Sequence, residues 1–215
     1  MEKDLSDYRK SYVKKELRSS EVPENPFVLF QKWFDAVEAS NSVEEANAMS
    51  VATVGSDGFP KNRIVLLKQL TEEGFVFYTN YNSEKGKAIT HNPQVCLSFF
   101  WPEMEQQIII KGRAEKVSPE ISDAYFASRP KGSQLGAWAS AQSTVVPSKE
   151  TLVATLAQQE ASFGDGKIPR PKHWGGFIVK PISMEFWQGR PNRMHDRIRF
   201  SSEQDNSWKI ERLAP

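Results

Sequence analysis

A stripe of apolar side chains recurs at helical spacing in the first fifth of the chain: Phe27, Phe30, Phe34 and Val37. This period predicts an amphipathic helix whose aromatic face packs against the core. Asn25 is a suitable N-cap, and Pro26 suits the first helical turn. The preceding residues 8–17 are polar with little to bury, so we expect a short polar helix or an arm there.

The pattern changes after residue 48, where β-branched and aromatic residues form short runs. We expect strands at residues 49–54, 64–68, 75–79, 95–101, 107–117, 176–187, 197–201 and 208–212. Turn-forming residues separate the first of these at 55–58, 71–74 and 91–93. Helical patterns cover residues 119–127, 134–140 and 148–163. Closely spaced strands favour an α+β protein with an antiparallel barrel core over a doubly wound sheet.

Composition narrows the class of protein. The 215 residues carry a formal net charge of +1, which is too small for a dedicated nucleic-acid binder. No apolar stretch approaches the roughly 18 residues of a membrane span, and residues 1–18 lack the apolar segment of a signal peptide. A single cysteine, Cys96, fits a reducing compartment. We therefore expect a cytoplasmic protein that binds neither membrane nor nucleic acid. No His or Cys pair has metal-ligand spacing, so no metal is expected.

Positive charge is concentrated in residues 187–197, which hold Trp187, three arginines, an aspartate and a histidine. Arginine binds phosphate or carboxylate with two parallel hydrogen bonds, and histidine changes charge near neutral pH. Arg193 and His195 are two residues apart, so in an extended segment both face one side. A solvated surface turn is the alternative, but further candidate phosphate sites elsewhere in the chain weaken it.

One further site lies between two cations, Arg63 and Lys68, at the ends of an apolar run. With period two these side chains project to opposite faces of a strand, so they can serve two anionic groups. Downstream, a polar strand end at residues 78–80 precedes a helix start near Lys85, which is a suitable place for a phosphate. From the local sequence alone, an ordinary polar loop is the favoured interpretation of residues 78–87.

The segment around Tyr125, Arg129 and Ser133 is more specific. On a helix, Arg129 lies at i+4 from Tyr125 and shares its face, and Pro130 stops the helix. Phenol, guanidinium and hydroxyl would then form a compact phosphate-binding set, with structural helix capping as the alternative. Amide and hydroxyl donors able to bind the edge of a heterocycle occur at Gln107, Gln142 and Ser143.

Together these motifs resemble the pyridoxine/pyridoxamine 5′-phosphate oxidase family over about residues 9–215. The matching segments are Arg63-Ile-Val-Leu-Leu-Lys68, Phe77-Tyr-Thr-Asn80, Ser128-Arg-Pro130, Gly136-Ala-Trp138, Trp174-Gly-Gly176, Glu185-Phe-Trp-Gln-Gly189, Arg193-Met-His-Asp-Arg197 and Glu211-Arg-Leu-Ala-Pro215. The resemblance implies an FMN-binding split β-barrel with peripheral helices, and a homodimer with flavin at the subunit interface. It divides the chain into an N-terminal arm, residues 1–20, that acts as an active-site lid, and a single flavin-binding domain, residues 21–215.

The resemblance also implies roles for individual residues. The flavin phosphate would be held by Arg63 and Lys85, with Gln142 and Ser143 reaching across from the other subunit. The rest of the flavin would contact Ile64, Val65, Leu66, Leu67, Lys68, Tyr78, Thr79, Gln107, Trp187 and Arg197. The substrate phosphate would be bound by Lys68, Tyr125, Arg129 and Ser133. Arg193 and His195 would be the catalytic residues over the substrate ring, and Arg9 and Tyr12 would close the lid.

The implied activity is the oxidation of pyridoxine or pyridoxamine 5′-phosphate to pyridoxal 5′-phosphate, with dioxygen reduced to hydrogen peroxide. Two alternatives stay open: a flavin reductase on the same barrel, and a non-catalytic carrier of flavin or pyridoxal phosphate. One position departs from the resemblance. The family usually has arginine immediately before the lysine of the flavin-phosphate site, whereas this chain has Glu84. A carboxylate there should weaken phosphate binding unless it turns away.

Overall fold

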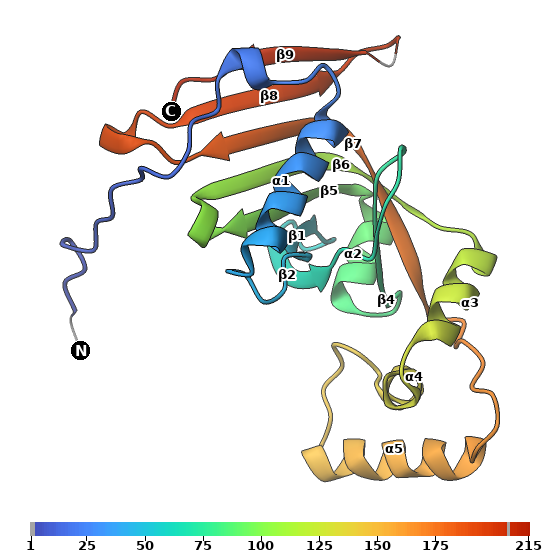
Figure 1. The fold of residues 1–215 in the computed structure, drawn as a ribbon. Coiled ribbons are helices and arrows are strands. Elements are labelled where there is room, and N and C mark those ends of the chain that lie inside the picture. Colours follow the sequence, from blue (N-terminus) through green and yellow to red (C-terminus); the bar gives the residue numbers. More distant parts are fainter. Residues whose placement is uncertain (1–2, 206) are drawn as a thin grey trace. The chain divides into compact units, whose positions relative to one another are not determined.

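The computed structural model describes residues 3–205 and 207–215 (Figure 1). The chain forms two compact units. The first unit contains the described residues up to Ala48 together with Leu97–Lys111 and Pro181–Pro215. The second unit contains Met49–Cys96 and Gly112–Lys180. No helix in the described part of the chain is both long and apolar enough to cross a membrane.

The first long helix, α1, covers Pro26–Ser40 and begins as its sequence predicts. The Asn25 side chain accepts a hydrogen bond from the Phe27 backbone N–H, and Asn41 ends the helix in the left-handed conformation. The predicted stripe is partly wrong, because Phe27 and Phe34 are only half-buried. The buried face of α1 instead consists of Pro26, Leu29, Phe30, Trp33 and Val37.

The described residues form nine strands. They are β1 (Ala48–Val54), β2 (Pro60–Leu66), β3 (Gln69–Leu70), β4 (Phe75–Asn80), β5 (Gln94–Trp101), β6 (Gln106–Lys116), β7 (Trp174–Gln188), β8 (Asp196–Ser202) and β9 (Trp208–Arg212). Their order is β2-β1-β5-β6-β7-β4-β3, with β8 joined to β7 and β9 to β8. The pairs β3–β4, β4–β7, β7–β8 and β8–β9 are antiparallel, as the sequence predicts. The strand expected at 64–68 begins earlier and ends at Leu66, so Lys68 lies beyond it.

Strand β7 contributes a different half to each unit. In the second unit its first half pairs with β4, where Tyr78 lies opposite Gly176. In the first unit its second half pairs with β8, where Trp187 lies opposite Arg197. Each half therefore presents a different set of the predicted site residues.

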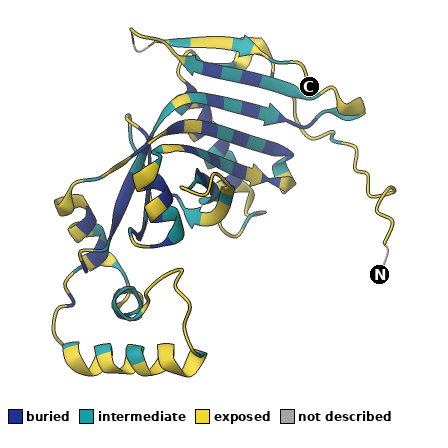
Figure 2. Ribbon diagram, turned by 180° about the vertical axis from the view of Figure 1, so that it is seen from behind, coloured by how far each residue is buried: buried dark blue, intermediate teal, exposed yellow. Residues whose placement is uncertain are grey.

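Four α-helices belong to the second unit: α2 (Glu84–His91), α3 (Pro119–Ser128), α4 (Lys131–Ala139) and α5 (Lys149–Phe163). The side chains of Ser83, Ser118 and Ser148 cap α2, α3 and α5 by accepting backbone N–H bonds. The predicted helices at 119–127 and 148–163 are confirmed, whereas the one predicted at 134–140 starts three residues earlier. Figure 2 shows α5 exposed along most of its length.

Candidate functional site

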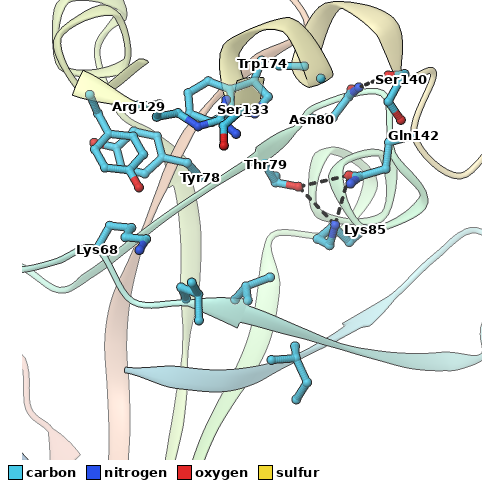
Figure 3. Close-up of a pocket in the computed structure, with 16 residues that line it drawn as sticks. Lys68, Tyr78, Thr79, Asn80, Lys85, Arg129, Ser133, Ser140, Gln142 and Trp174 are labelled. Carbon is cyan, nitrogen blue, oxygen red and sulfur yellow. Dashed lines mark hydrogen bonds between the residues drawn. The ribbon is translucent and has the colours of Figure 1, made fainter. Parts of the chain in front are cut away.

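A pocket of about 460 Å³ lies in the second unit (Figure 3). Eleven of its lining residues are ones that the sequence had singled out: Ile64, Val65, Leu66, Lys68, Tyr78, Thr79, Lys85, Tyr125, Arg129, Ser133 and Gln142. They come from β2, β4, α2, α3, α4 and the segments that follow them. The fold therefore gathers residues that are up to 78 positions apart in the sequence, from 64 to 142.

Lys85 provides a cation at one end of the pocket. It lies in the first turn of α2, and its ammonium donates to Thr79 Oγ1 at 3.1 Å and to Gln142 Oε1 at 3.3 Å. Burial, and then the nearby Arg63, lower the pKa of Lys85. Among the ion pairs of residues 3–205 and 207–215, none involves Lys85. An incoming anion would supply the counter-charge that this ammonium lacks.

Arg129 provides a second cation. It follows the last residue of α3 in an extended conformation, as expected immediately before Pro130. Its guanidinium lies 4.6 Å from the centre of the Trp174 ring, a cation–π contact. Its Nη1 atom is buried without a hydrogen-bond partner among the described residues, and burial lowers the pKa of Arg129. A buried charged donor left unpaired is costly, so this atom fits an anionic ligand oxygen.

Three aromatic rings form a parallel stack beside Arg129. The Tyr78 and Tyr125 rings are 3.9 Å apart at 16°, and the Tyr78 and Trp174 rings are 5.5 Å apart at 10°. Burial raises the pKa of the Tyr125 phenol, which therefore stays a hydrogen-bond donor at neutral pH. Figure 3 shows Lys68 and Ser133 in the part of the pocket around Tyr78 and Arg129. Ammonium, phenol, guanidinium and hydroxyl groups thus line one region, as phosphate recognition requires.

Arg63 does not line this pocket, in contrast to Lys68. Its Nη2 atom is 3.6 Å from Glu84 Oε2, and Glu84 Oε1 accepts a bond from Lys61 Nζ at 2.8 Å. Lys61 also pairs with Asp57. The hydrogen bond from Lys61 lowers the pKa of Glu84. The carboxylate at the unusual position is therefore ionised and paired with two cations.

In the first unit, Trp187 and His195 lie together with Tyr12 of the N-terminal arm. The His195 ring is 4.8 Å from the Trp187 ring, and the Tyr12 ring meets both edge-on at 5.6 and 5.7 Å. The Arg190 backbone N–H donates to His195 Nδ1 at 3.1 Å, which leaves the proton of the neutral ring on Nε2. Burial, followed by the charge of Arg193, lowers the pKa of His195.

The extended conformation expected at Arg193 is wrong. Pro191–Arg193 form a 3₁₀ turn, and Asn192 and Arg193 have φ values of 57° and 60°. The geometric argument that placed Arg193 and His195 on one side therefore does not apply. The Arg193 side chain is exposed. A left-handed arginine is uncommon and is a type of local strain that concentrates at functional sites.

The other predicted residues lie outside the pocket lining, and their roles stay predictions. Arg197 is held by Glu185 and by the Ala214 carbonyl, each at 2.8 Å. Gln107 donates to Ser98 at 3.0 Å, and Arg9 to the Ser6 carbonyl at 3.0 Å. Leu67 is buried and Ser143 is exposed. Gln142 reaches Lys85 within its own chain, so its contact with this cation does not require a partner.

Sequence reasoning missed several residues of the pocket lining: Asn80, Gly136, Ala137, Ser140 and Trp174. Asn80 is the last residue of the polar strand end predicted at residues 78–80, and its amide nitrogen lies 3.4 Å from the Ser140 carbonyl oxygen. Trp174 belongs to one of the matching motifs, but its contact with Arg129 joins the start of β7 to the residue after α3, which no local pattern reveals. Lys61, the second residue of β2, carried no local signal, because an isolated lysine is usually solvated.

Comparison with known families gives two matches that together cover most of the chain. The family model described as pyridoxamine 5′-phosphate oxidase matches residues 36–162. A second model, described as the pyridoxine 5′-phosphate oxidase C-terminal dimerisation region, matches residues 174–215.

Individual relatives agree. A protein of Flavobacterium johnsoniae, named pyridoxine/pyridoxamine 5′-phosphate oxidase, is 61% identical over 98% of this chain and 99% of its own length. A protein of the same name from Flavobacterium psychrophilum is 59% identical over 99% of this chain and all of its own. The crystal structure of PhzG from Burkholderia lata, in complex with tetrahydrophenazine-1-carboxylic acid, has a TM-score of 0.85 and 29% identity, covering 91% of this chain and 95% of its own. These matches confirm the predicted α+β split-barrel fold.

Proposed function

Because the chain belongs to the pyridoxamine 5′-phosphate oxidase family, we propose that it oxidises pyridoxine or pyridoxamine 5′-phosphate to pyridoxal 5′-phosphate. FMN is the cofactor in this proposal, and dioxygen takes up the electrons and leaves as hydrogen peroxide. The enzyme acts in the cytoplasm as a homodimer. The observation that carries the proposal is the buried, unpartnered Nη1 of Arg129, in the same pocket as the Lys85 ammonium.

The two cationic regions suit the phosphates of two different ligands. Lys85, with Thr79 and Gln142, would hold the phosphate of FMN, and the β2 residues that line the pocket would lie along its ring. Lys68, Tyr125, Arg129 and Ser133 would bind the phosphate of the substrate. When bound, FMN supplies the acceptor for the two electrons that leave the substrate carbon. Anchoring the substrate by its phosphate fixes the position of that carbon and reduces the entropy cost of reaction.

His195 is best suited to orient the substrate. Its Nδ1 already accepts the Arg190 N–H, so the neutral ring offers a proton on Nε2 and no free lone pair. Nε2 therefore donates to the hydroxyl or amino group of the substrate and does not remove its proton. Arg193 supplies a fixed positive charge beside it.

The subunit arrangement is also part of the proposal. We infer that residues 1–20 form a lid over a single domain, residues 21–215, and that Arg9 and Tyr12 close on the substrate. In the dimer, Ser143 of one subunit would complete the FMN site of the other, whereas Gln142, which contacts Lys85 of its own chain, would serve the site of its own subunit. A two-fold interface completes both sites at once.

A single aerobic assay separates this function from its alternatives. Purified protein loaded with FMN is mixed with pyridoxamine 5′-phosphate in air, without a nicotinamide cofactor, and pyridoxal 5′-phosphate and peroxide are followed together. We expect both products in equal amounts. A flavin reductase would give neither product in this mixture and would form peroxide only after reduced nicotinamide is added, and a carrier would bind ligand without producing peroxide; either result would contradict the proposal.

A further inference from the structure

Glu105 is a buried acidic residue of the first unit, and the proposed chemistry does not use it. Its side chain is 1% exposed. It lies between the 3₁₀ turn Pro102–Met104 and β6, with a φ of 55°. A buried carboxylate is costly unless its oxygens are satisfied. The identity of its donors therefore indicates what the residue does.

Those donors belong to the N-terminal arm. Glu105 Oε2 accepts from the backbone N–H groups of Val13 and Lys14, at 2.9 and 3.0 Å. Lys10 Nζ lies 3.8 Å from the other carboxylate oxygen. Two backbone amides on one oxygen fix the path of the chain, independently of the arm's exposed side chains. Hydrogen bonds to a charged acceptor are about twice as strong as neutral ones.

The backbone of Glu105 binds the segment on which the arm rests. Its carbonyl accepts from the Gly189 N–H at 2.8 Å and from Gln188 Nε2 at 3.1 Å. Glu105 therefore binds the arm through its side chain and the end of β7 through its backbone carbonyl. Tyr12 immediately precedes the Val13 and Lys14 amides that Glu105 binds. Its ring contacts the rings of Trp187 and His195.

Gly189 gives independent support for this close fit. A Cβ atom at this position would lie 2.7 Å from Tyr12 Cγ and 2.8 Å from Tyr12 Cβ. Glycine therefore leaves the space that the Tyr12 ring occupies. The Tyr12 ring therefore packs against Trp187 of β7 and against Gly189, the residue that follows β7.

We propose that Glu105 is a positioning residue that latches the arm, so that Tyr12 is held against Trp187 and His195. This inference rests on the proposed function, in which His195 orients the substrate and Tyr12 closes on it. Loss of the latch frees Tyr12 and weakens substrate binding, whereas FMN binding is unaffected.

The test compares Glu105→Ala with Glu103→Ala, which removes an exposed carboxylate of the same turn whose ion pair with Lys14 Nζ, at 3.9 Å, is a solvent-screened surface contact with the arm. Hydrogen exchange at the Val13 and Lys14 amides is measured by NMR on the full-length holoenzyme, and steady-state kinetics with pyridoxine 5′-phosphate are measured in parallel. We expect Glu105→Ala to speed exchange of both amides and to raise KM about 10-fold, with kcat and FMN affinity little changed. Glu103→Ala should leave all four quantities unchanged. Glu105→Gln keeps one oxygen acceptor and should restore most of the KM.

A Tyr12→Ala variant completes the design. If Glu105 acts through Tyr12, its effect on KM should largely disappear in the Tyr12→Ala background. Unchanged amide exchange, unchanged KM or fully additive effects would each overturn the inference. If Glu105→Ala does not fold, Glu105→Gln should still speed exchange several-fold, since a neutral acceptor binds more weakly, and unchanged exchange there would overturn it. An inactive wild-type protein would contradict the proposed function instead, and amide exchange would still decide whether the latch exists.

Discussion

Glu84 would compete with the FMN phosphate for Arg63, which the resemblance assigns to that phosphate although Arg63 lies outside the pocket lining. The Glu84 carboxylate lies 3.6 Å from the Arg63 guanidinium and accepts a bond from Lys61. Arg63 is therefore turned toward a side chain that most of the family is expected to lack. A phosphate monoester carries nearly two negative charges at neutral pH, so removing this carboxylate should favour its binding.

We predict that Glu84→Arg tightens FMN binding several-fold and leaves kcat of the saturated enzyme nearly unchanged. Glu84→Gln, which removes the charge without reversing it, should give an intermediate affinity. Fluorescence titration of the apoprotein with FMN measures both. The gain should shrink as salt is raised, because the groups are exposed. Equal or weaker affinity at low salt would show that the Glu84 carboxylate does not oppose the phosphate.

His195 sets a second prediction, for the pH dependence. Burial and Arg193 lower the pKa of His195, so the neutral ring persists as pH falls to values below the ordinary imidazole pKa of about 6.5. Protonation at Nδ1 removes the acceptor of the Arg190 N–H and so frees the orientation of the ring. The acidic fall in kcat/KM that depends on this ring should therefore lie below that pH, and His195→Asn should lack it. An NMR titration of the three histidines provides a direct check. A His195 midpoint at or above 6.5 would contradict the account.

At the scale of elements, helix α2 depends on a close approach at Gly86. A Cβ atom there would lie 2.4 Å from the Tyr81 carbonyl oxygen and 2.7 Å from that of Asn80. The helix carries Lys85, and the strand end beside it carries Thr79. The space left by one glycine therefore positions the proposed FMN-phosphate site.

Gly86→Ala should displace the start of α2, with a loss of stability of about 1–3 kcal/mol and much weaker FMN binding. Gly132→Ala is a matched control in another helix, because its Cβ meets nothing within 4 Å. It should be neutral or stabilising by about 0.5–1 kcal/mol. Thermal denaturation and FMN titration measure the two effects. A Gly86→Ala protein with normal stability and FMN affinity would show that α2 tolerates the shift.

Local signals determined most elements, and tertiary contacts explain the differences. Asn25 and Pro26 predicted the start of α1, and Pro130 predicted the end of α3, because caps and proline act within one turn. The predicted stripe did not locate the buried face of α1, because it omitted Leu29 and Trp33, which lie on that face. Strand β2 ends at Leu66, so Lys68 lies outside it. The Lys68 backbone N–H nevertheless donates to the Val76 carbonyl.

At the scale of the whole molecule, the sequence could indicate candidate binding residues but not how the fold groups them. The proposed phosphate donors Tyr125 and Arg129 are neighbours in the chain and were singled out from their spacing. Their contacts with Tyr78 and Trp174 join β4, α3 and β7, which no local pattern reveals. The Glu105 latch was missed for the same reason, since its partners are more than 90 residues away.

The match of residues 174–215 to a dimerisation region leads to a prediction about assembly. We expect full activity and tight FMN binding only in the dimer, because Ser143 is proposed to complete the site of the partner. Analytical ultracentrifugation over a range of concentrations, with activity measured at each, tests this. A monomer that keeps FMN and full activity would contradict it.

The central claim is that the pocket recognises a phosphorylated substrate and brings it to flavin. Anaerobic mixing of the FMN-loaded protein with pyridoxine 5′-phosphate tests it most directly, because loss of the flavin's visible absorbance reports electron transfer without dioxygen. We predict rapid bleaching with pyridoxine 5′-phosphate, little with unphosphorylated pyridoxine at the same concentration, and at least ~10-fold lower substrate efficiency in Arg129→Ala. No bleaching by the phosphorylated substrate, or equal bleaching by both compounds, would contradict the account.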